Sequence, residues 1–348
     1  MKFDIKKLQG ILDRAVETKE ECGLQLAIYD HGELAVELCS GFADRARSTE
    51  VTSKTLFPVY SCGKGVMTAA FHLLAERGCL RYDDRIADHW PEYGCNGKEE
   101  TLIWQALSHR AAVSALPPLE SPSDMGNWEL MCRKLAESTP ANTPGGPCAY
   151  HGVTFAWLIG ETASRSSGVF FGDFIKQEIF RKLNIENDFF FGTDAAADAR
   201  MAQVDGSEDS WCRTFIENDK IRHGFVPSAN GVGTASALAR IYAAITSGVD
   251  GNKLLTEATV ENATILRRAW NDPLPESWTK FGLGWVLPNM PETSAVFGHG
   301  GALGGEAFAD RERKIAVGFV KNHVTATAPV HPVRDAISEA LGLPVRYW

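Results

Sequence analysis

The sequence has no stretch of apolar residues long enough to span a bilayer. Its N-terminus, Met1–Leu8, has neither the apolar core nor the small-residue cleavage site of a signal peptide. Basic residues are also outnumbered, with 35 Lys and Arg against 44 Asp and Glu and a net charge of −9. Because the Lys and Arg residues are scattered and form no basic cluster, we do not expect a nucleic acid as a partner. We therefore expect a cytoplasmic protein that binds neither membranes nor nucleic acids.

The signatures of several enzyme classes are missing as well. There is no Gly-x-Ser-x-Gly, which an α/β-hydrolase esterase would carry. The nine histidines are dispersed without a His-x-x-x-His pair, and Gly231–Ser236 lacks the third glycine of a dinucleotide-binding loop. The eight cysteines form no Cys-x-x-Cys pair, so we expect reduced thiols that pack as small core residues. These absences predict a protein without a metal ion or a cofactor.

What the chain does have is length and strand-like segments at both ends. Its 348 residues, 44% of them hydrophobic, suffice for a large core in two domains or in one domain with an insertion. Strands are expected at 23–29, 33–39, 281–287, 295–298, 306–309 and 315–320, and helices at 5–18, 61–77, 102–108, 128–138, 154–165, 170–183, 235–247 and 330–341. We therefore expect a sheet domain built from residues 1–79 and 226–348, with residues 80–225 as a mainly helical insertion. An active site would lie in the cleft between these two parts.

A serine and a lysine stand three residues apart at the start of an apolar run with helical spacing. Side chains at this spacing share one face of a helix, so Lys64 is placed to act on the Ser61 hydroxyl. A serine is a poor nucleophile until a base takes its proton, and a lysine is that base only if its pKa is lowered. On spacing alone, an N-cap serine followed by a solvated lysine explains the pattern better. Cys62 is a rival nucleophile outside this register, and we interpret it as a packing residue.

A loop rich in proline and glycine, Thr143–Gly152, presents Tyr150 and His151 just before a predicted helix. A tyrosine with a lowered pKa can take the serine proton and return it to a leaving group. Taken alone, a partly buried aromatic residue at a loop–helix junction explains Tyr150 better. The loop indicates a catalytic function only in combination with the Ser61–Lys64 pair and the glycine-rich segment Phe297–Gly305.

Glycines surround a single histidine in Phe297–Gly305. Glycine weakens a strand unless something must approach the backbone closely. A strand edge without side chains can hold a substrate alongside it and offer a backbone N–H to an oxyanion. In isolation, a glycine-rich bulge or hairpin explains the segment equally well.

Together and in this order, the three segments resemble the serine β-lactamase and penicillin-binding protein superfamily. The likeness is greatest to its class C-like branch of family VIII carboxylesterases and related serine hydrolases. Three further stretches carry the same resemblance, namely Tyr150–Gly160, Pro227–Ala235 and Phe281–Trp285. The likeness runs from about residue 20 to residue 325, which is nearly the whole chain.

The resemblance implies an α+β fold of the β-lactamase/transpeptidase type, an antiparallel sheet flanked by helices with a helical insertion. It implies Ser61 as the nucleophile, with Lys64 and Tyr150 as its proton network. The backbone N–H groups of Ser61 and Ala302 would form the oxyanion hole. Substrate contacts would come from His151, His299, Gly300 and Gly301. The reaction would be acylation of the serine followed by hydrolysis of the acyl-enzyme.

Departures from the family pattern narrow the expected substrate. Penicillin-recognising members usually have a lysine and then a hydroxyl residue on the third strand, where this chain has His299 and Gly300. A histidine is mostly uncharged near neutrality and glycine has no hydroxyl, so the binding of a substrate carboxylate is weakened. The second motif has His151-Gly152 where Ser-Asn is more usual. We expect a carboxylesterase for small or short-chain esters, with weak or no β-lactamase activity.

Alternatives to the esterase remain at this stage. A D-amino-acid peptidase or amidase, or a β-lactamase, would use the same nucleophile on a small amide. A non-catalytic binding protein on the same scaffold should have lost the serine, the lysine or the tyrosine, and all three are present. Nothing in the sequence indicates an oligomeric state.

Overall fold

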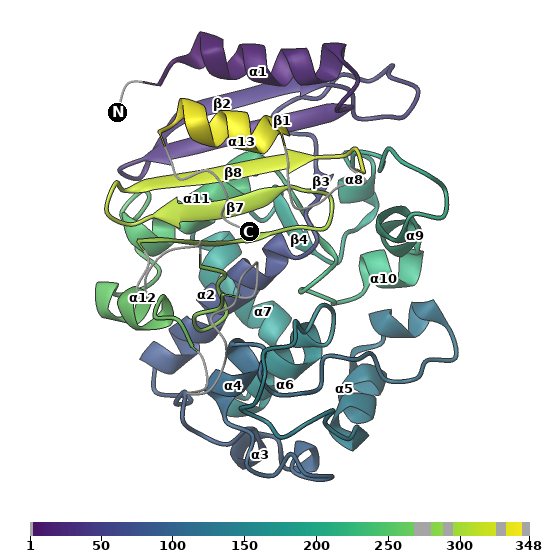
Figure 1. Cartoon of the computed structure of the whole chain (residues 1–348), viewed down its shortest axis with the longest axis vertical. Helices are drawn as coiled ribbons and strands as arrows, with labels where there is room; N and C mark the ends of the chain where they lie inside the picture. The colour runs from purple at the N-terminus through teal and green to yellow at the C-terminus, as the bar shows by residue number, and fades with distance from the viewer. Residues whose placement is uncertain (1–2, 268–279, 288–294, 325–331, 343–348) are drawn as a thin grey trace.

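A five-stranded antiparallel sheet in the order β2-β1-β8-β7-β6 combines strands from both ends of the chain in the computed structural model (Figure 1). The structure describes residues 3–267, 280–287, 295–324 and 332–342. The strands of this sheet are β1 (Gly23–Asp30), β2 (Glu33–Gly41), β6 (Val296–Gly300), β7 (Glu306–Asp310) and β8 (Ile315–Lys321). The first and last strands of the chain thus meet at the centre of the sheet, where Leu24 lies opposite Lys321.

Helices cover both faces of this sheet. On β1, Leu26 and Ile28 pack in one cluster with Leu12 of the first helix, whereas Ala27 and Tyr29 belong to the cluster on the other face. This period of two is what a strand buried on both faces requires. The first face is covered by α1 (Ile5–Glu17) and α13 (Pro332–Ala340), and the second by α11 (Ala235–Thr246) (Figure 1). The predicted α+β sheet flanked by helices is therefore confirmed.

The middle of the chain is mainly helical. Its helices are α3 (Ile86–His89), α4 (Ile103–Leu107), α5 (Trp128–Glu137), α6 (Phe155–Ser167), α7 (Phe171–Ile175), α8 (Ala195–Asp198), α9 (Trp211–Glu217) and α10 (Asp219–His223), and α12 (Glu257–Ala263) follows α11. Short 3-10 turns lie at Pro91–Tyr93 and Pro122–Gly126, and α7 continues as a π-helical stretch, Lys176–Arg181. A small antiparallel sheet, ordered β3-β5-β4, joins Phe57–Pro58, Gly231–Gly233 and Phe189–Phe191. The domain boundaries at residues 79 and 225 stay a prediction.

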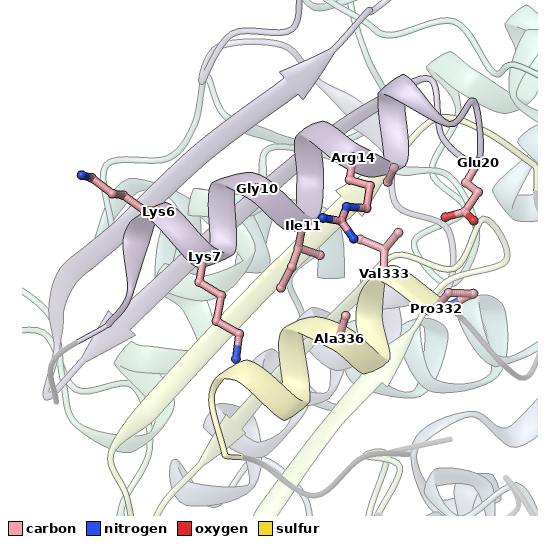
Figure 2. A pocket seen from close by; sticks show the side chains of 10 residues that line it. Lys6, Lys7, Gly10, Ile11, Arg14, Glu20, Pro332, Val333 and Ala336 are labelled. Carbon is pink, nitrogen blue, oxygen red and sulfur yellow. The ribbon is translucent and has the colours of Figure 1, made fainter.

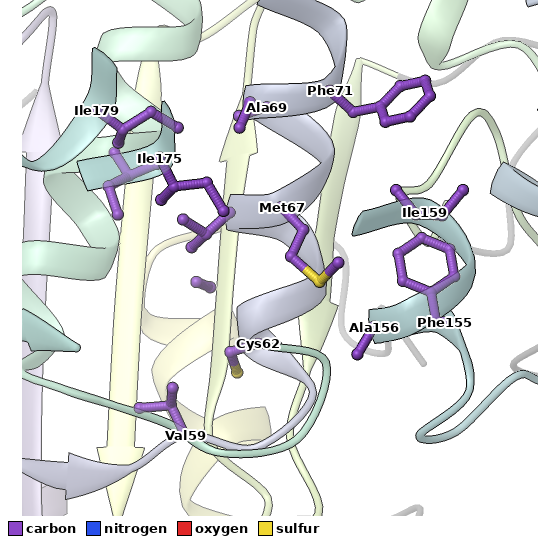
Figure 3. Close-up of a cluster of buried hydrophobic side chains, with 14 of the residues drawn as sticks. Val59, Cys62, Met67, Ala69, Phe71, Phe155, Ala156, Ile159, Ile175 and Ile179 are labelled. Atoms are coloured by element: carbon purple, nitrogen blue, oxygen red, sulfur yellow. The ribbon is translucent and has the colours of Figure 1, made fainter. Parts of the chain in front are cut away.

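Helix α2 (Cys62–Glu76) is packed between the sheet and the helical part. Every residue from Cys62 to Leu74 is buried. Figure 3 shows Met67 pointing toward Phe155 and Ile159 of α6, with Ile175 and Ile179 on the opposite side of α2. A helix that is buried all round is held rigidly in place, so the residues at its first turn have a fixed position.

One predicted strand is wrong. Residues 281–287 form a tight bend in which Phe281 and Val286 make an isolated bridge with each other. The cause lies in two glycines: Gly284 has a φ of +90°, and a Cβ on Gly282 would lie 2.0 Å from the Ala263 carbonyl oxygen. The bend closes on itself and places Val286 beside Gly298 of β6. It thereby brings Phe281 toward the site described below.

A groove of about 450 Å³ lies between α1 and α13, on the face of the sheet away from α2 (Figure 2). It is lined by Lys6, Lys7, Gly10, Ile11, Arg14, Ala15, Glu20, Pro332, Val333 and Ala336. None of the candidate site residues borders it. None of the described helices has the length and apolar composition needed to cross a membrane.

Candidate active site

Ser61 stands immediately before α2, as its N-cap residue. Its neighbour Tyr60 has a φ of +46°, a backbone conformation that costs a bulky residue about 1–3 kcal/mol. Tyr60 is held there because its buried hydroxyl donates to the Cys212 carbonyl at 2.6 Å. The strained turn presents Ser61 as the one partly exposed residue among buried neighbours. The Cys62 thiol is buried, and burial raises its pKa, so it stays protonated and packs as predicted.

The Lys64 amine lies 3.0 Å from the Ser61 hydroxyl oxygen in a fully buried position. It also donates to the carbonyl oxygens of Gly152 at 2.6 Å and Ser228 at 2.8 Å. Burial lowers the pKa of Lys64 well below its usual value, which favours the neutral amine. A neutral amine has two N–H groups, and the two carbonyls take both of them. Its lone pair is then left for the serine proton.

Tyr150 lies beside the same hydroxyl. Its phenol is hydrogen-bonded to Ser61, and its ring centre is 4.9 Å from the Lys64 amine. Phe281 stacks on the ring with 6.0 Å between centroids. Burial raises the pKa of Tyr150, and only part of that effect is offset by the Ser61 hydrogen bond. This direction is opposite to the lowering that would let Tyr150 take the serine proton, and Tyr150 holds its proton at neutral pH.

Strand β6 ends next to these groups. The His299 ring lies 6.1 Å from the Tyr150 ring between centroids, and its Nδ1 is 2.7 Å from the Gly300 carbonyl oxygen. Burial and the nearby Lys64 lower the pKa of His299 to about 3, so the imidazole is neutral. A Cβ on Gly301 would lie 2.3 Å from the Val59 carbonyl oxygen, so only glycine permits this contact with the turn before Ser61.

The next residue, Ala302, is exposed at the turn that follows β6. Among the described residues, neither its N–H nor that of Ser61 donates to a backbone carbonyl. Both donors therefore stay available to a third group.

A family model described as beta-lactamase matches residues 8–341. This chain belongs to the β-lactamase family. It is 27% identical to the esterase/beta-lactamase LipL of Mycobacterium tuberculosis, over 91% of this chain and 83% of LipL. It is likewise 27% identical to a family VIII carboxylesterase of known crystal structure, with a TM-score of 0.86 and coverage of 97% and 96%. A penicillin-binding protein homologue from Caulobacter crescentus is 29% identical, with a TM-score of 0.85 over 97% of each chain.

The family assignment confirms the fold and the general chemistry predicted from the sequence. The protein is a serine hydrolase with the β-lactamase/transpeptidase-like fold. Among the described residues, no group of three or more His, Cys, Asp or Glu side chains is placed to hold a metal ion. None of the eight cysteines of this β-lactamase family member, all of which lie in the described part of the chain, forms a disulfide bond.

His151, which the sequence suggests as a substrate contact, is buried with both ring nitrogens engaged by backbone groups. Nδ1 lies 2.7 Å from the Ala149 carbonyl oxygen, and Nε2 accepts the Val113 N–H at 3.3 Å. This arrangement favours a role in holding the loop over contact with a substrate. His109, which belongs to none of the three sequence motifs, packs its ring 4.9 Å from that of Tyr150 between centroids. The only indication of His109 in the sequence is its position just after the predicted helix 102–108.

The buried histidines of this β-lactamase family member predict that it loses stability in acid. Burial lowers the pKa of His72 and His151 to about 4 and that of His299 to about 3, from 6.5. Below pH 6.5 the unfolded imidazoles take up protons that the folded ones do not, so unfolding becomes more favourable as pH falls toward 4. Each histidine should lower the free energy of unfolding by about 1.4 kcal/mol per pH unit in that window.

Urea unfolding curves between pH 7.5 and pH 4.5 measure this effect. His72→Asn should flatten the dependence on pH. A free energy of unfolding that is constant over this range would contradict the prediction.

Proposed function

We propose that this serine hydrolase is a carboxylesterase for small, uncharged esters that works through an acyl-enzyme on Ser61. The proposal rests above all on the buried Lys64 amine, 3.0 Å from the Ser61 hydroxyl, with both of its N–H groups taken by carbonyls. Such an amine has its lone pair directed at the Ser61 hydroxyl proton and can act as the base that removes it. The positive end of α2 favours the serine oxygen as it gains negative charge.

In acylation, Lys64 takes the proton of Ser61 while the serine oxygen attacks the ester carbonyl carbon. The tetrahedral intermediate collapses as the bond to the leaving oxygen breaks, and Tyr150 gives its proton to that oxygen. Lys64, now an ammonium, returns a proton to Tyr150. Water then attacks the acyl-enzyme with the same groups, and release of the acid restores Ser61.

The backbone N–H groups of Ser61 and Ala302 would receive the oxyanion of the intermediate. They lie at the start of α2 and just after β6, which Gly301 brings into contact with the turn before Ser61. Two fixed donors stabilise charge that develops only in the transition state.

The end of β6 supports an uncharged substrate. His299 is neutral and buried, and Gly300 offers no hydroxyl. A substrate carboxylate would therefore meet neither a cation nor a hydroxyl donor on this strand, and charge-assisted hydrogen bonds are the stronger ones. We assign His299, Gly300 and Gly301 to the wall along which the ester lies.

A comparison of three substrates tests the proposal. The kcat/KM for a short-chain nitrophenyl ester should exceed that for a D-Ala-D-Ala peptide and for a chromogenic cephalosporin by about 100-fold or more, the value of one lost charge-assisted contact. The concentration of active enzyme is fixed by titration with a fluorophosphonate.

Equal or faster turnover of the cephalosporin would assign the site to a β-lactamase instead, and preferred turnover of the peptide would assign it to a peptidase. No turnover of any substrate and no phosphonate adduct would indicate a binding protein.

A further inference from the structure

The loop that carries Tyr150 is tied on both sides of the tyrosine to the turn that carries His109. On one side, the Ala149 N–H donates to the His109 carbonyl oxygen at 2.9 Å. On the other, the His151 N–H donates to His109 Nδ1 at 3.1 Å. The Val113 N–H completes the connection by donating to His151 Nε2 at 3.3 Å. We call these contacts the His109–His151 clamp.

The clamp requires both imidazoles to be neutral. His109 accepts at Nδ1, so its proton is on Nε2, whereas His151 accepts at Nε2 and donates from Nδ1 to the Ala149 carbonyl at 2.7 Å. Burial lowers the pKa of both rings, and for His109 the neighbouring His151, Lys64 and His299 lower it further. A protonated His109 would have no lone pair with which to accept the His151 N–H.

His109 also supports the Tyr150 ring directly. Its ring centroid lies 4.9 Å from that of Tyr150, 4.2 Å from Phe281 and 4.9 Å from Phe155. The backbone at His109 has a φ of +60°, which is uncommon for a residue other than glycine. Such a conformation persists only where the surrounding structure holds it in place.

We propose that His109 is a positioning residue, which through the His109–His151 clamp holds the Tyr150 phenol where it can protonate a leaving group. His109 touches neither the substrate nor Ser61 in this role. The inference rests on the proposed esterase mechanism and adds a residue to it. It assigns a function to the hydrogen bonds of the His109–His151 clamp, which the mechanism does not otherwise use.

The test compares two esters of the same acid. Ethoxide needs a proton to leave, whereas nitrophenolate is a weak base and leaves without one, so a misplaced Tyr150 should affect the ethyl ester selectively. His109→Leu removes the Nδ1 acceptor, and kcat/KM should fall about 100-fold for the ethyl ester and less than about 10-fold for the nitrophenyl ester. Rates are expressed per Ser61 titrated with a fluorophosphonate, so a smaller folded fraction does not change them.

A conservative variant should rescue the loss. His109→Asn keeps a side-chain acceptor near the position of Nδ1, and asparagine tolerates a positive φ. It should retain kcat/KM for the ethyl ester within about 10-fold of the wild type. Tyr150→Phe should show the same preference for the nitrophenyl ester as His109→Leu.

His72→Asn is the matched control, because His72 is another buried histidine whose ring packs on Tyr82 and Trp285 rather than on Tyr150. It should leave the ratio of the two rates unchanged. If His109→Leu yields no titratable Ser61, His151→Leu carries the test, since it removes the acceptor of the Val113 N–H from the other half of the clamp.

Equal losses for the two esters, or no loss, in an active His109→Leu enzyme would overturn the clamp. A wild type that cleaves neither ester would overturn the proposed function instead.

Discussion

Replacing Ser61 by alanine is expected to lower kcat/KM for ester hydrolysis by about 10⁴- to 10⁶-fold, as loss of a serine nucleophile does in other hydrolases. The acyl-enzyme cannot form without the hydroxyl, while Lys64 and Tyr150 lose only their shared partner. Because Ser61 is partly exposed and Lys64 keeps its two carbonyl partners, the free energy of unfolding should change by less than about 1 kcal/mol. Nitrophenyl-ester kinetics and urea unfolding measure the two effects.

Labelling locates the nucleophile independently of turnover. A fluorophosphonate should add its mass to the peptide that contains Ser61 in the wild type and in Cys62→Ala, and not in Ser61→Ala. Cys62 is the matched control because it is adjacent in the chain and its buried thiol is protonated. An adduct on Cys62, together with activity retained in Ser61→Ala, would refute the assignment.

Lys64→Met should lower kcat/KM by about 10³- to 10⁴-fold, near the upper range for loss of a general base. Methionine is similar in length and apolar, so it fills the buried space but takes no proton. In the wild type, kcat/KM should fall as pH drops through the lowered pKa of Lys64, because the ammonium form cannot accept the serine proton. The residual activity of Lys64→Met should lack this acidic limb.

Lys98→Met is the control that distinguishes the loss of a catalytic base from the loss of a buried lysine. Lys98 is likewise fully buried and donates to two backbone carbonyls, those of Cys95 and Ser138. Its replacement should lower stability and leave kcat/KM unchanged. A loss of activity in Lys98→Met as large as that in Lys64→Met would mean that the buried amine of Lys64 matters only for folding.

The proximity of the candidate site's main side chains was predictable, because they stand in motifs with recognisable spacing. Ser61 and Lys64 are one helical turn apart, and the glycines around His299 indicate a strand that lets another segment approach. The carbonyls of Gly152 and Ser228 were not predictable, since any residue type supplies a backbone oxygen. These two acceptors leave the lysine lone pair directed at the serine.

The features that the sequence did not reveal also depend on tertiary structure. The direction of the Tyr150 pKa depends on how deeply its loop is buried, which loop composition does not reveal. The strand predicted at 281–287 has the right apolar residues, but Gly282 and Gly284 bend it. His109 was not predicted because its place beside Tyr150 depends on tertiary packing and on a positive φ, and no motif in the sequence indicates either.

The central pairing of the sheet also sets the order in which the enzyme can mature on the ribosome. Gly23 donates to the side chain of Asn322, 299 positions along the chain. Until β8 has been synthesised, the edge of β1 is open as well as that of β2, and such edges invite aggregation. The pairs formed over this distance are slow to close. Ser61 and Lys64 are thus synthesised early, but β6, the strand that borders their site, joins the sheet only when nearly all of the chain has emerged.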